Sequence, residues 1–265
     1  MTQGRQRHYP EEVRKAWSDL ESSGFALVPG LLGPDELCRI DEALGAVRQT
    51  EAVRKRTGVY AIRNLLDAVP EVAEVANSPA IRALVISALG EDAIAVRGTL
   101  FDKTPDANWL VPWHQDVTIC VRERNEVAGF GPWTMKAGVH HVQPPVRFLE
   151  QMLAIRIHLD DCHEHNGPLR VLPGTHRLGR LSRIAIEEAQ AVGVPVTCVM
   201  KQGGAVLMKP LLLHASSAAQ FPSHRRVIHL DFASATLPPG LTWFTDQARV
   251  RNSWRGVPFR HFSGR

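Results

Sequence analysis

Three side chains with metal-binding chemistry lie in two segments about a hundred residues apart, Trp113-His114-Gln115-Asp116 and His214. His114 and Asp116 are two positions apart, so in a β-strand both side chains would leave the same face of the sheet. His214 follows Asp116 by 98 residues, within the apolar run 206–219. Two imidazoles and one carboxylate that leave the other positions of a metal open form the ligand set of non-haem Fe(II) oxygenases. These residue types therefore predict an iron centre.

An arginine follows His214 by 11 residues, at Arg225. A guanidinium can hold a carboxylate through two parallel hydrogen bonds, as an oxo-acid cosubstrate of such an iron centre would require. Arg226 is the neighbouring alternative, because a shift of one residue along a strand reverses the face to which a side chain points. Ser216 is two residues from His214 and would share its face, where its hydroxyl could reach the same carboxylate.

The metal assignment has rivals, because the chain contains 12 histidines and the pattern His-x-Asp occurs three times. The further copies begin at His158 and His229, and each taken alone is typical of a strand histidine with a hydrogen-bonded partner. We favour His114 because the second imidazole and the arginine fit around it. No ligand role is expected for the histidines at 140–141, which would point to opposite faces of a strand, or at 163–165, which lie in a turn.

Four blocks of the sequence, in order, resemble the phytanoyl-CoA dioxygenase family: residues 113–116, 166–176, 214–217 and 225–228. The resemblance extends from about Ser23 to about Ala235. It implies an Fe(II)- and 2-oxoglutarate-dependent oxygenase with a double-stranded β-helix, or jelly-roll, core and with O2 as the second cosubstrate. Residue by residue, it implies iron ligands at His114, Asp116 and His214, a 2-oxoglutarate contact at Arg225 and an accessory contact at Ser216.

Four further residues are candidates for contacting a bound molecule. Arg97 and Thr99 share one face of the expected strand 93–103, and both could meet a ligand if that face points inward. An inward arginine, whether Arg97 or Arg156, costs several kcal/mol unless an anion pairs with it. Arg63 lies in a region where family members often place another basic contact to 2-oxoglutarate. We therefore assign Thr99 and Arg63 to the cosubstrate, and Arg97 and Arg156 to the substrate.

The segment 122–149 directly follows the strand expected for His114 and Asp116, and glycines and prolines interrupt it. Loops of this length without regular structure are usually functional, so we expect an irregular lid over the metal. The alternative is a surface loop packed on its own apolar residues. No compact cluster of lysine and arginine flanks the segment, so we expect a small, partly apolar metabolite rather than an acyl-CoA. Its candidate substrate contacts are Phe130, Trp133, Lys136 and His140.

Helices come first along the chain and strands later. Pro10-Glu11-Glu12 begins a helix that Gly24 can end, and Pro34-Asp35-Glu36 begins a second helix. Two more helices are expected near 71–76 and 79–89. Strands are expected at 25–32, 93–103, 113–121, 152–161, 169–172, 195–201, 205–209, 211–218 and 225–233. A strand-rich core with helices packed outside it predicts a mainly β jelly roll with flanking N-terminal helices.

The composition is that of a globular protein, with 265 residues, 44% hydrophobic and 22% charged. We expect one domain over residues 1–265, in which an aromatic tail at 238–265 folds over the core or lies at a subunit interface. The polar start without an apolar run, and four cysteines without a Cys-x-x-Cys pair, indicate a reduced, cytoplasmic protein. The net charge is +4, but no basic stripe is present, so we expect no binding of nucleic acid. We expect no association with a membrane. We also expect the protein to be a monomer or a homodimer.

The sequence favours an oxygenase that hydroxylates, or otherwise oxidises, an unactivated C–H bond of a small-molecule metabolite, with succinate and CO2 as coproducts. Two alternatives stay open. A zinc hydrolase could use the same two histidines and aspartate with a bound water, although Arg225 would then have no role. A jelly-roll protein could also bind a ligand without catalysis. The substrate, and the choice among hydroxylation, desaturation and ring formation, are left open.

Overall fold

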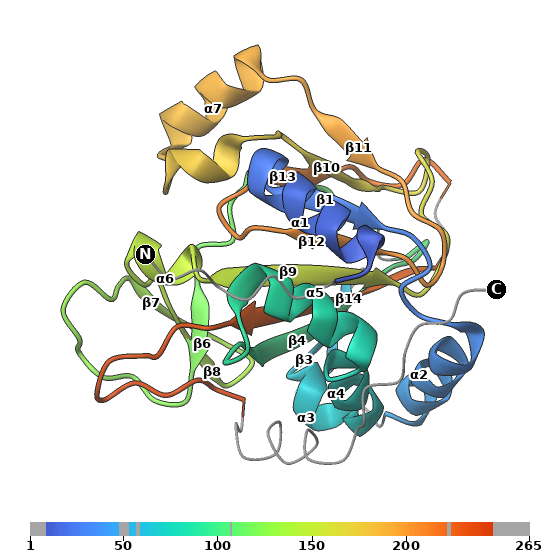
Figure 1. The fold of residues 1–265 in the computed structure, drawn as a ribbon, viewed down its shortest axis with the longest axis horizontal. Helices are drawn as coiled ribbons and strands as arrows, with labels where there is room; N and C mark the ends of the chain where they lie inside the picture. Colours follow the sequence, from blue (N-terminus) through green and yellow to red (C-terminus); the bar gives the residue numbers. More distant parts are fainter. Residues whose placement is uncertain (1–8, 48–52, 57–58, 107, 222–223, 246–265) are drawn as a thin grey trace.

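The computed structural model describes residues 9–47, 53–56, 59–106, 108–221 and 224–245, and Figure 1 shows its helices and sheets. The helices are α1 (Glu11–Ser23), α2 (Pro34–Ala46), α3 (Leu65–Ala68), α4 (Pro70–Ala76), α5 (Pro79–Leu89), α6 (Val146–Leu149) and α7 (Arg183–Val192), with a 3-10 turn at Thr175–Leu178. The strands are β1 (Phe25–Val28), β2 (Val53–Arg56), β3 (Val59–Arg63), β4 (Ile94–Lys103), β5 (Val111–His114), β6 (Ile119–Val121), β7 (Trp133–Lys136), β8 (Val139–Val142), β9 (Met152–His158), β10 (Leu169–Val171), β11 (Val196–Cys198), β12 (Ala205–Met208), β13 (His214–Ser216) and β14 (Arg225–Ala233).

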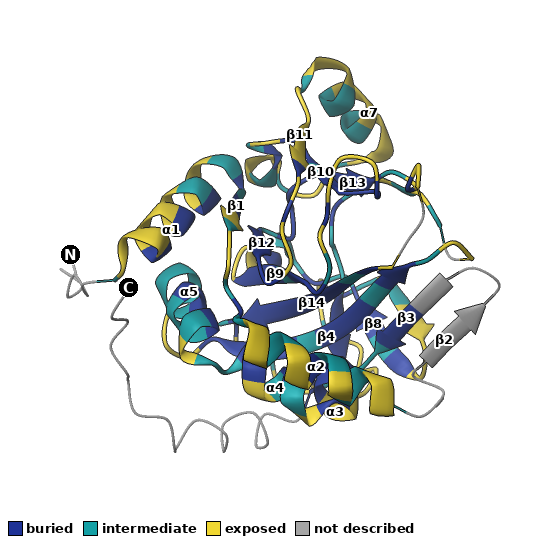
Figure 2. Ribbon diagram, turned by 90° about the vertical axis from the view of Figure 1, so that its right-hand side faces the viewer, coloured by how far each residue is buried: buried dark blue, intermediate teal, exposed yellow. Residues whose placement is uncertain are grey.

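The largest sheet has seven strands in the order β1-β12-β9-β14-β4-β3-β2, and every neighbouring pair is antiparallel. One face of this sheet is apolar, and the N-terminal helices cover it (Figure 2). Ile155 and Ile157 of β9 point to this face, where they form one buried cluster with residues such as Leu20 of α1 and Ile81 of α5. Removing this apolar surface from water holds the helices against the sheet.

A four-stranded sheet in the order β11-β10-β13-β5 packs against the other face of the large sheet. A second buried cluster joins the two sheets, with Ala154 and Val206 from the large sheet and Leu169 and Val171 from the small one. Two antiparallel sheets packed face to face form a jelly roll. The predicted mainly β, double-stranded β-helix core with flanking N-terminal helices is confirmed.

The face of the large sheet that points into the jelly roll is rich in charge. Every second residue of β4 from Arg97 to Lys103 lies on it, and so does every second residue of β14 from Arg225 to Asp231. The antiparallel register places Arg225 opposite Lys103 and Asp231 opposite Arg97. Because buried charges are costly unless they are paired, this face marks the functional interior of the protein.

The single strand expected over 113–121 is wrong. The chain leaves the four-stranded sheet after His114 and enters β6 in a separate three-stranded sheet, β6-β8-β7. Asp116 therefore lies in a loop rather than on the strand of His114. Geometry within one strand does not bring the two side chains together, so the tertiary structure must do so.

The irregular lid expected over 122–149 is also wrong in its structure, because the segment contains β7, β8 and α6. The short apolar stretches between its glycines pair with one another and with β6. Val121, Val142 and Phe148 lie in a third buried cluster, which fixes these strands on the rest of the protein. Strands β2 and β3 and helix α3 were not expected either.

The helix boundaries at the start of the chain follow local sequence signals. The predictions of helices beginning at Pro10-Glu11-Glu12 and at Pro34-Asp35-Glu36 are confirmed by α1 and α2. At Gly24, where α1 ends, φ is 84°, a left-handed conformation that costs glycine little. A Cβ atom at this position would also clash with the ring of His176, so the turn into β1 requires glycine for two reasons.

The aromatic tail is described as far as Thr245. Trp243 is buried, pairs with Val121 in an isolated β-bridge and donates its indole N–H to the carbonyl of Ala235 at 3.3 Å. This part of the tail lies against the core. Residues 246–265, with Trp254, Phe259 and Phe262, lie outside the described residues.

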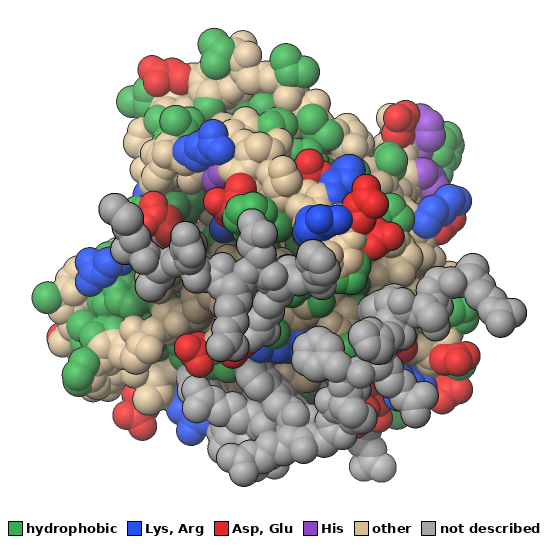
Figure 3. Space-filling model, viewed as in Figure 1, with side chains coloured by type: hydrophobic (Ala, Val, Ile, Leu, Met, Phe, Trp, Pro, Cys, Tyr) green, Lys and Arg blue, Asp and Glu red, His purple; other side chains and the backbone are tan. Residues whose placement is uncertain are grey.

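The four cysteines are free. On the face of the molecule seen in Figure 3, acidic and basic side chains are interspersed. In the part of the chain that the structure describes, no single helix is long and apolar enough to cross a membrane, and only α4 and α5 together, bent by 54°, would qualify by length and composition. The expectations of no nucleic acid, of a monomer or homodimer and of a cytoplasmic protein stay predictions.

Candidate metal centre

Strands β5 and β13 bring the two predicted histidines together. His114 ends β5 and His214 begins β13, and they are direct partners in the antiparallel register. Asp116 is held over the same point because its backbone N–H donates to the carbonyl of Pro210 at 2.9 Å. Its carboxylate oxygens lie 3.9 Å from Nε2 of His114 and 3.6 Å from Nε2 of His214. One metal ion could therefore contact all three side chains, whose ligand atoms lie within 4.8 Å of one another.

Both imidazoles are oriented as metal binding requires. Nδ1 of His114 donates to the carbonyl of Pro112 at 2.8 Å, and Nδ1 of His214 donates to the carbonyl of Leu212 at 2.9 Å. Because a carbonyl oxygen can only accept, the proton lies on Nδ1, and each Nε2 keeps its lone pair for a ligand. A backbone acceptor on the outer nitrogen is the usual support of a metal-binding histidine.

The protonation states also suit a divalent cation. Burial lowers the pKa of His214 to about 4, so that its imidazole is neutral at pH 7. Burial would by itself raise the pKa of Asp116, but the nearby His214, His229, His114 and Arg97 outweigh this effect and hold that pKa below its usual value. A neutral imidazole and an ionised carboxylate are the forms that bind metal.

Gln115 fixes the loop that carries Asp116, and nothing in its residue type or spacing singles it out. The buried side chain of Gln115 donates to the carbonyls of Leu211 at 2.7 Å and Gly179 at 2.8 Å, and it accepts from the N–H of Leu181 at 2.8 Å. All three partners are backbone groups far away in the chain. This role therefore could not be predicted from residue types or their spacing.

A pair of buried cations lies at the other end of the polar interior. Arg225 and Lys103 are opposite each other on β14 and β4, and they are 2% and 1% exposed. Lys103 Nζ donates to the hydroxyl of Ser216 at 3.2 Å and also to the carbonyl of Ser217. Arg225 donates to the carbonyl of Gly167 at 2.8 Å. Since Ser216 is two residues from His214, this basic pair and the metal-binding histidines share one interior.

Lys103 is a candidate functional residue that was not selected from the sequence. It lies on the expected strand 93–103, on the same face as Arg97 and Thr99, and a lysine within such a strand was the available signal. Burial, followed by the positive charge of Arg225, lowers the pKa of Lys103 to about 7. Burial also lowers the pKa of Arg225. Burial thus disfavours both charges, and for Lys103 the neighbouring Arg225 adds to this effect.

The two neighbouring arginines point to opposite sides of β14. Arg226 lies on the outer side, where its guanidinium pairs with Asp160 at 2.7 Å and Asp41 at 2.8 Å. These bonds, led by that to Asp160, raise its pKa above the usual value. Arg225 has no carboxylate partner among the described residues. Of the two, Arg225 is the guanidinium that could bind an anion in the interior.

Several buried polar atoms of the jelly-roll interior lack partners among the described residues. They are Nε of Arg225, Nε of Arg156 and both ring nitrogens of His158. Burial, together with Arg156 and Arg225, lowers the pKa of His158 to about 3. Orphaned buried donors are costly, so they indicate a bound molecule with several oxygen acceptors. A dicarboxylate with a keto group, such as 2-oxoglutarate, fits this donor set.

Of two arginines assigned to bound molecules, Arg63 lies elsewhere than expected, whereas Arg156 points inward as expected. Arg63 does not join the basic pair but lines a separate pocket with Arg97, Lys136 and Thr99. Arg156 lies in the jelly-roll interior, where a nitrogen of its guanidinium is 2.8 Å from Nδ1 of His229. The backbone of Arg63 is opposite Thr99, four residues along β4 from Lys103, and at about 3.3 Å per residue it is too distant to share a carboxylate with that lysine.

The aromatic residues assigned to the substrate belong to the core or the surface. Phe130 is 7% exposed and packs edge to face on Phe148, with the ring centroids 5.2 Å apart. Trp133 packs against the same buried cluster. His140 lies beside Trp133, with the ring centroids 6.5 Å apart, whereas its neighbour His141 points into the pocket of Arg63 and Arg97. Because successive side chains of β8 point to opposite faces of the sheet, His141 lines this pocket and His140 does not.

Comparison with known proteins identifies relatives of both the sequence and the fold. The sequence model of the family described as Phytanoyl-CoA dioxygenase (PhyH) matches residues 20–227. No curated protein is similar enough to the chain to count as a match.

Several solved structures share the fold. AviO1 from Streptomyces viridochromogenes Tue57 is 22% identical, with coverage of 87% of this chain and 99% of its own and a TM-score of 0.64. The non-heme alpha ketoglutarate dependent epimerase SnoN from nogalamycin biosynthesis is 19% identical, with 90% of each chain covered and a TM-score of 0.65. EctD from S. alaskensis is 19% identical, with 88% and 79% covered and a TM-score of 0.67. At these identities the likeness shows the fold.

Proposed function

The chain belongs to the phytanoyl-CoA dioxygenase family, and from this premise we propose that it oxidises an unactivated C–H bond of a small-molecule metabolite, most simply by hydroxylation. It is a non-haem iron oxidoreductase that uses Fe(II), 2-oxoglutarate and O2. When bound, the iron with 2-oxoglutarate and O2 supplies the oxidising chemistry, and 2-oxoglutarate leaves as succinate and CO2.

The observation that carries the proposal is the placement of His114, Asp116 and His214 in one polar interior with the basic pair. In the proposed site these three residues hold the iron. The hydrogen bonds from the two Nδ1 atoms to backbone carbonyls hold the imidazoles in place, and the hydrogen bonds of Gln115 hold the loop that carries Asp116. Three protein ligands leave the other coordination positions to the cosubstrates.

The basic pair would hold the distal carboxylate of 2-oxoglutarate, with the hydroxyl of Ser216 as a further donor. Structures of EctD with bound Fe, and with 2-oxoglutarate and 5-hydroxyectoine, are among those that share the fold. The unpartnered Nε–H of Arg156 and the one ring N–H of neutral His158 are available to other oxygens of the same molecule. The protein thus contributes position, charge and exclusion of water, while the iron contributes reactivity.

The buried basic pair also favours this function over the two alternatives. A zinc hydrolase would need a metal-bound water and its substrate, and would leave the cost of burying Lys103 and Arg225 uncompensated. A protein that only binds a ligand would not need both imidazoles aligned on one point with Asp116. We further propose that residues 1–265 form one oxygenase domain.

One experiment separates the three functions. Purified protein freed of metal is supplied with Fe(II) or Zn(II), with 2-oxoglutarate, and with pooled metabolites in air or under nitrogen. Succinate should form only with Fe(II), 2-oxoglutarate and O2 together, and mass spectrometry should find a product heavier by one oxygen or lighter by two hydrogens. Hydrolysis that depends on zinc, or binding without succinate, would contradict the proposal.

The affinity for 2-oxoglutarate is expected to fall as the pH rises above about 7. Lys103, with a pKa of about 7 in the free protein, is partly neutral there, and only the protonated amine attracts a carboxylate. Binding would raise this pKa and take up a proton, so the affinity should fall by up to about tenfold per pH unit above 7 and stay flat below about 6. The other groups that act on Lys103 are Arg225, Cys162 and Arg156.

Anaerobic titration of 2-oxoglutarate between pH 6 and 9 measures this dependence. The Lys103→Met variant should bind 2-oxoglutarate more weakly at pH 6 and lose most of the slope above pH 7. An equal slope in that variant would show that another group, such as the Cys162 thiol, titrates instead.

A further inference from the structure

A groove of about 590 Å³ lies between helix α7 and the four-stranded sheet, on the side of that sheet that faces away from the jelly-roll interior. Figure 1 shows α7 beside the strands of this sheet. The sheet lines the groove with Trp113 of β5, Ala215 of β13 and Arg170 of β10, and the helix lines it with Ile186 and Gln190. A volume of this size is typical of a site for a small molecule.

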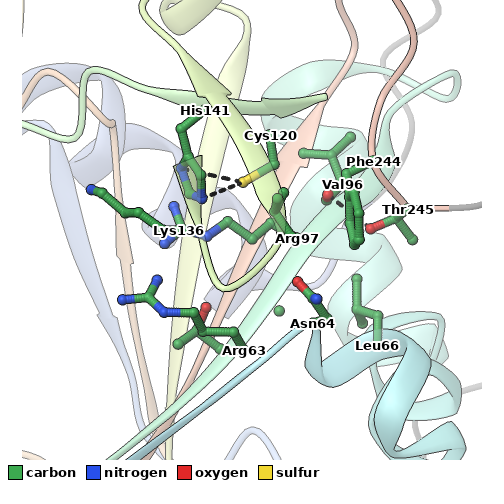
Figure 4. A pocket seen from close by; sticks show the side chains of 13 residues that line it. Arg63, Asn64, Leu66, Val96, Arg97, Cys120, Lys136, His141, Phe244 and Thr245 are labelled. Atoms are coloured by element: carbon green, nitrogen blue, oxygen red, sulfur yellow. Dashed lines mark hydrogen bonds between the residues drawn. The ribbon is translucent and has the colours of Figure 1, made fainter. Parts of the chain in front are cut away.

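The pocket at the border of β3, β4 and β7, shown in Figure 4, differs from this groove. It leaves about 10 Å³ of free volume, and its Arg97 is paired with Asp231 at 3.6 Å. Such a volume takes no more than a water molecule. Of these two hollows, the groove beside α7 is therefore the one that can take a small molecule.

Helix α7 does not fill the groove. None of its ten residues is buried, and Figure 2 shows exposed and intermediate residues along the helix. A helix that packs on a sheet usually buries an apolar stripe, but Ile186, which lines the groove, is partly exposed, and Ile184 is 68% exposed. Apolar surface of the helix and of the sheet is thus accessible to a bound molecule.

The groove contains one arginine without an acidic partner. The guanidinium of Arg170 lies over the ring of Trp113, 5.5 Å from the ring centroid, and no carboxylate among the described residues pairs with it. Among the described residues that line the groove, the one carboxylate is Glu187, and it is paired with Arg183 at 2.9 Å. Arg170 therefore gives the groove a net positive charge, which attracts an anion. Its guanidinium can hold a carboxylate by two parallel hydrogen bonds.

Apolar side chains surround this charge. Besides Trp113, the groove is lined by Leu110, Val111, Pro112 and Ile186. An aromatic ring placed against them would remove apolar surface from water on both sides of the contact. The lining therefore suits a molecule that combines a flat apolar part with one negative charge.

The groove lies behind the candidate metal centre. His114 and His214 are partners on β5 and β13, and the residues next to them, Trp113 and Ala215, line the groove. Because successive side chains of a strand point to opposite faces, the imidazoles and the groove lie on opposite sides of the sheet. A molecule in the groove cannot reach the metal, so it would be neither the cosubstrate nor the compound that is oxidised.

We propose that the groove between α7 and the four-stranded sheet binds a small aromatic carboxylate, as a ligand that the enzyme does not oxidise. Arg170 binds the carboxylate, and the apolar residues at 110–112 and Ile186 contact the ring. This inference goes beyond the proposed function, because the ligand needs neither the metal nor 2-oxoglutarate.

Isothermal titration calorimetry with naphthoate, a flat aromatic anion, tests the proposal. The protein is titrated under nitrogen, both free of metal and with Fe(II) and saturating 2-oxoglutarate, and the Kd should be the same in the two forms. Naphthol has the ring without the charge, and acetate has the charge without the ring, so each should bind at least about tenfold more weakly. Displacement of naphthoate by 2-oxoglutarate would place it in the jelly-roll interior and contradict the proposal.

The decisive variant is Arg170→Met, which removes the positive charge from the groove and keeps a long apolar side chain. Its Kd for naphthoate should rise about tenfold or more, the usual effect of losing a hydrogen bond to a charged partner. Arg147→Met is the matched control, because Arg147 also lies over an aromatic ring, 5.0 Å from the centroid of Phe148, but outside the groove. Gln190→Glu is a second variant, which adds a negative charge to the groove and should also weaken naphthoate binding.

Equal Kd values for naphthoate in the Arg170→Met and Arg147→Met variants, or equal Kd values of the wild type for naphthoate and naphthol, would overturn the proposed site. A second copy of the chain is the other candidate occupant. A dimer that Gln190→Glu dissociates and that does not bind naphthoate, observed by analytical ultracentrifugation, would assign the groove to that copy instead. Succinate formation tests the proposed function separately, and Arg170→Met should leave it unchanged.

Discussion

Replacement of His114, Asp116 or His214 by alanine is expected to reduce turnover by more than about 100-fold, to the background of the assay. Each residue supplies one of three protein ligands, and loss of even a supporting partner of a metal ligand costs roughly 10- to 100-fold. The variants should also fail to give the weak visible absorption band that Fe(II) and 2-oxoglutarate produce together under nitrogen. Succinate formation and this band are the two measurements.

His163→Ala is the matched control for these variants, because His163 is an exposed histidine away from the three ligands. It should keep full activity and the absorption band. Circular dichroism and the melting temperature establish that each ligand variant is folded. Full activity in any one of the three folded variants would remove that residue from the metal centre.

Replacement of Arg225 by alanine is expected to weaken 2-oxoglutarate binding by about 10- to 150-fold. This range corresponds to the roughly 1.5–3 kcal/mol that a hydrogen bond to a charged partner contributes. Arg226→Ala should leave the binding nearly unchanged, because Arg226 pairs with Asp160 and Asp41 on the outer side of β14. Titration of 2-oxoglutarate into both iron-loaded variants under nitrogen measures the difference.

The two variants are well matched, because each loses one positive charge and the two positions are adjacent. Arg226→Ala should lower the melting temperature through the loss of two part-buried ion pairs, without a matching change in Kd. If the larger change in Kd belonged to Arg226, the strand would present the opposite face and the assignment would be wrong by one residue.

The sequence by itself predicted the parts that depend on local chemistry. Helix α1 begins after Pro10 and ends at Gly24 because proline and glycine favour those backbone angles wherever the chain goes. Strand β14 spans the expected residues, 225–233. The order and spacing of the sequence motifs predicted the family, the jelly-roll core and the enzyme class. All three predictions are confirmed.

Only the tertiary structure decided which distant residues meet. Asp116 reaches the histidines from a loop held by Gln115, Lys103 meets Arg225 through the register of β4 with β14, and Phe130 turns into the core. Arg63 lies near Arg97 because β3 pairs with β4, and the sequence pattern did not predict β3. Strand pairing and register depend on the packing of the whole sheet, and a single strand's sequence carries its period but not its partner.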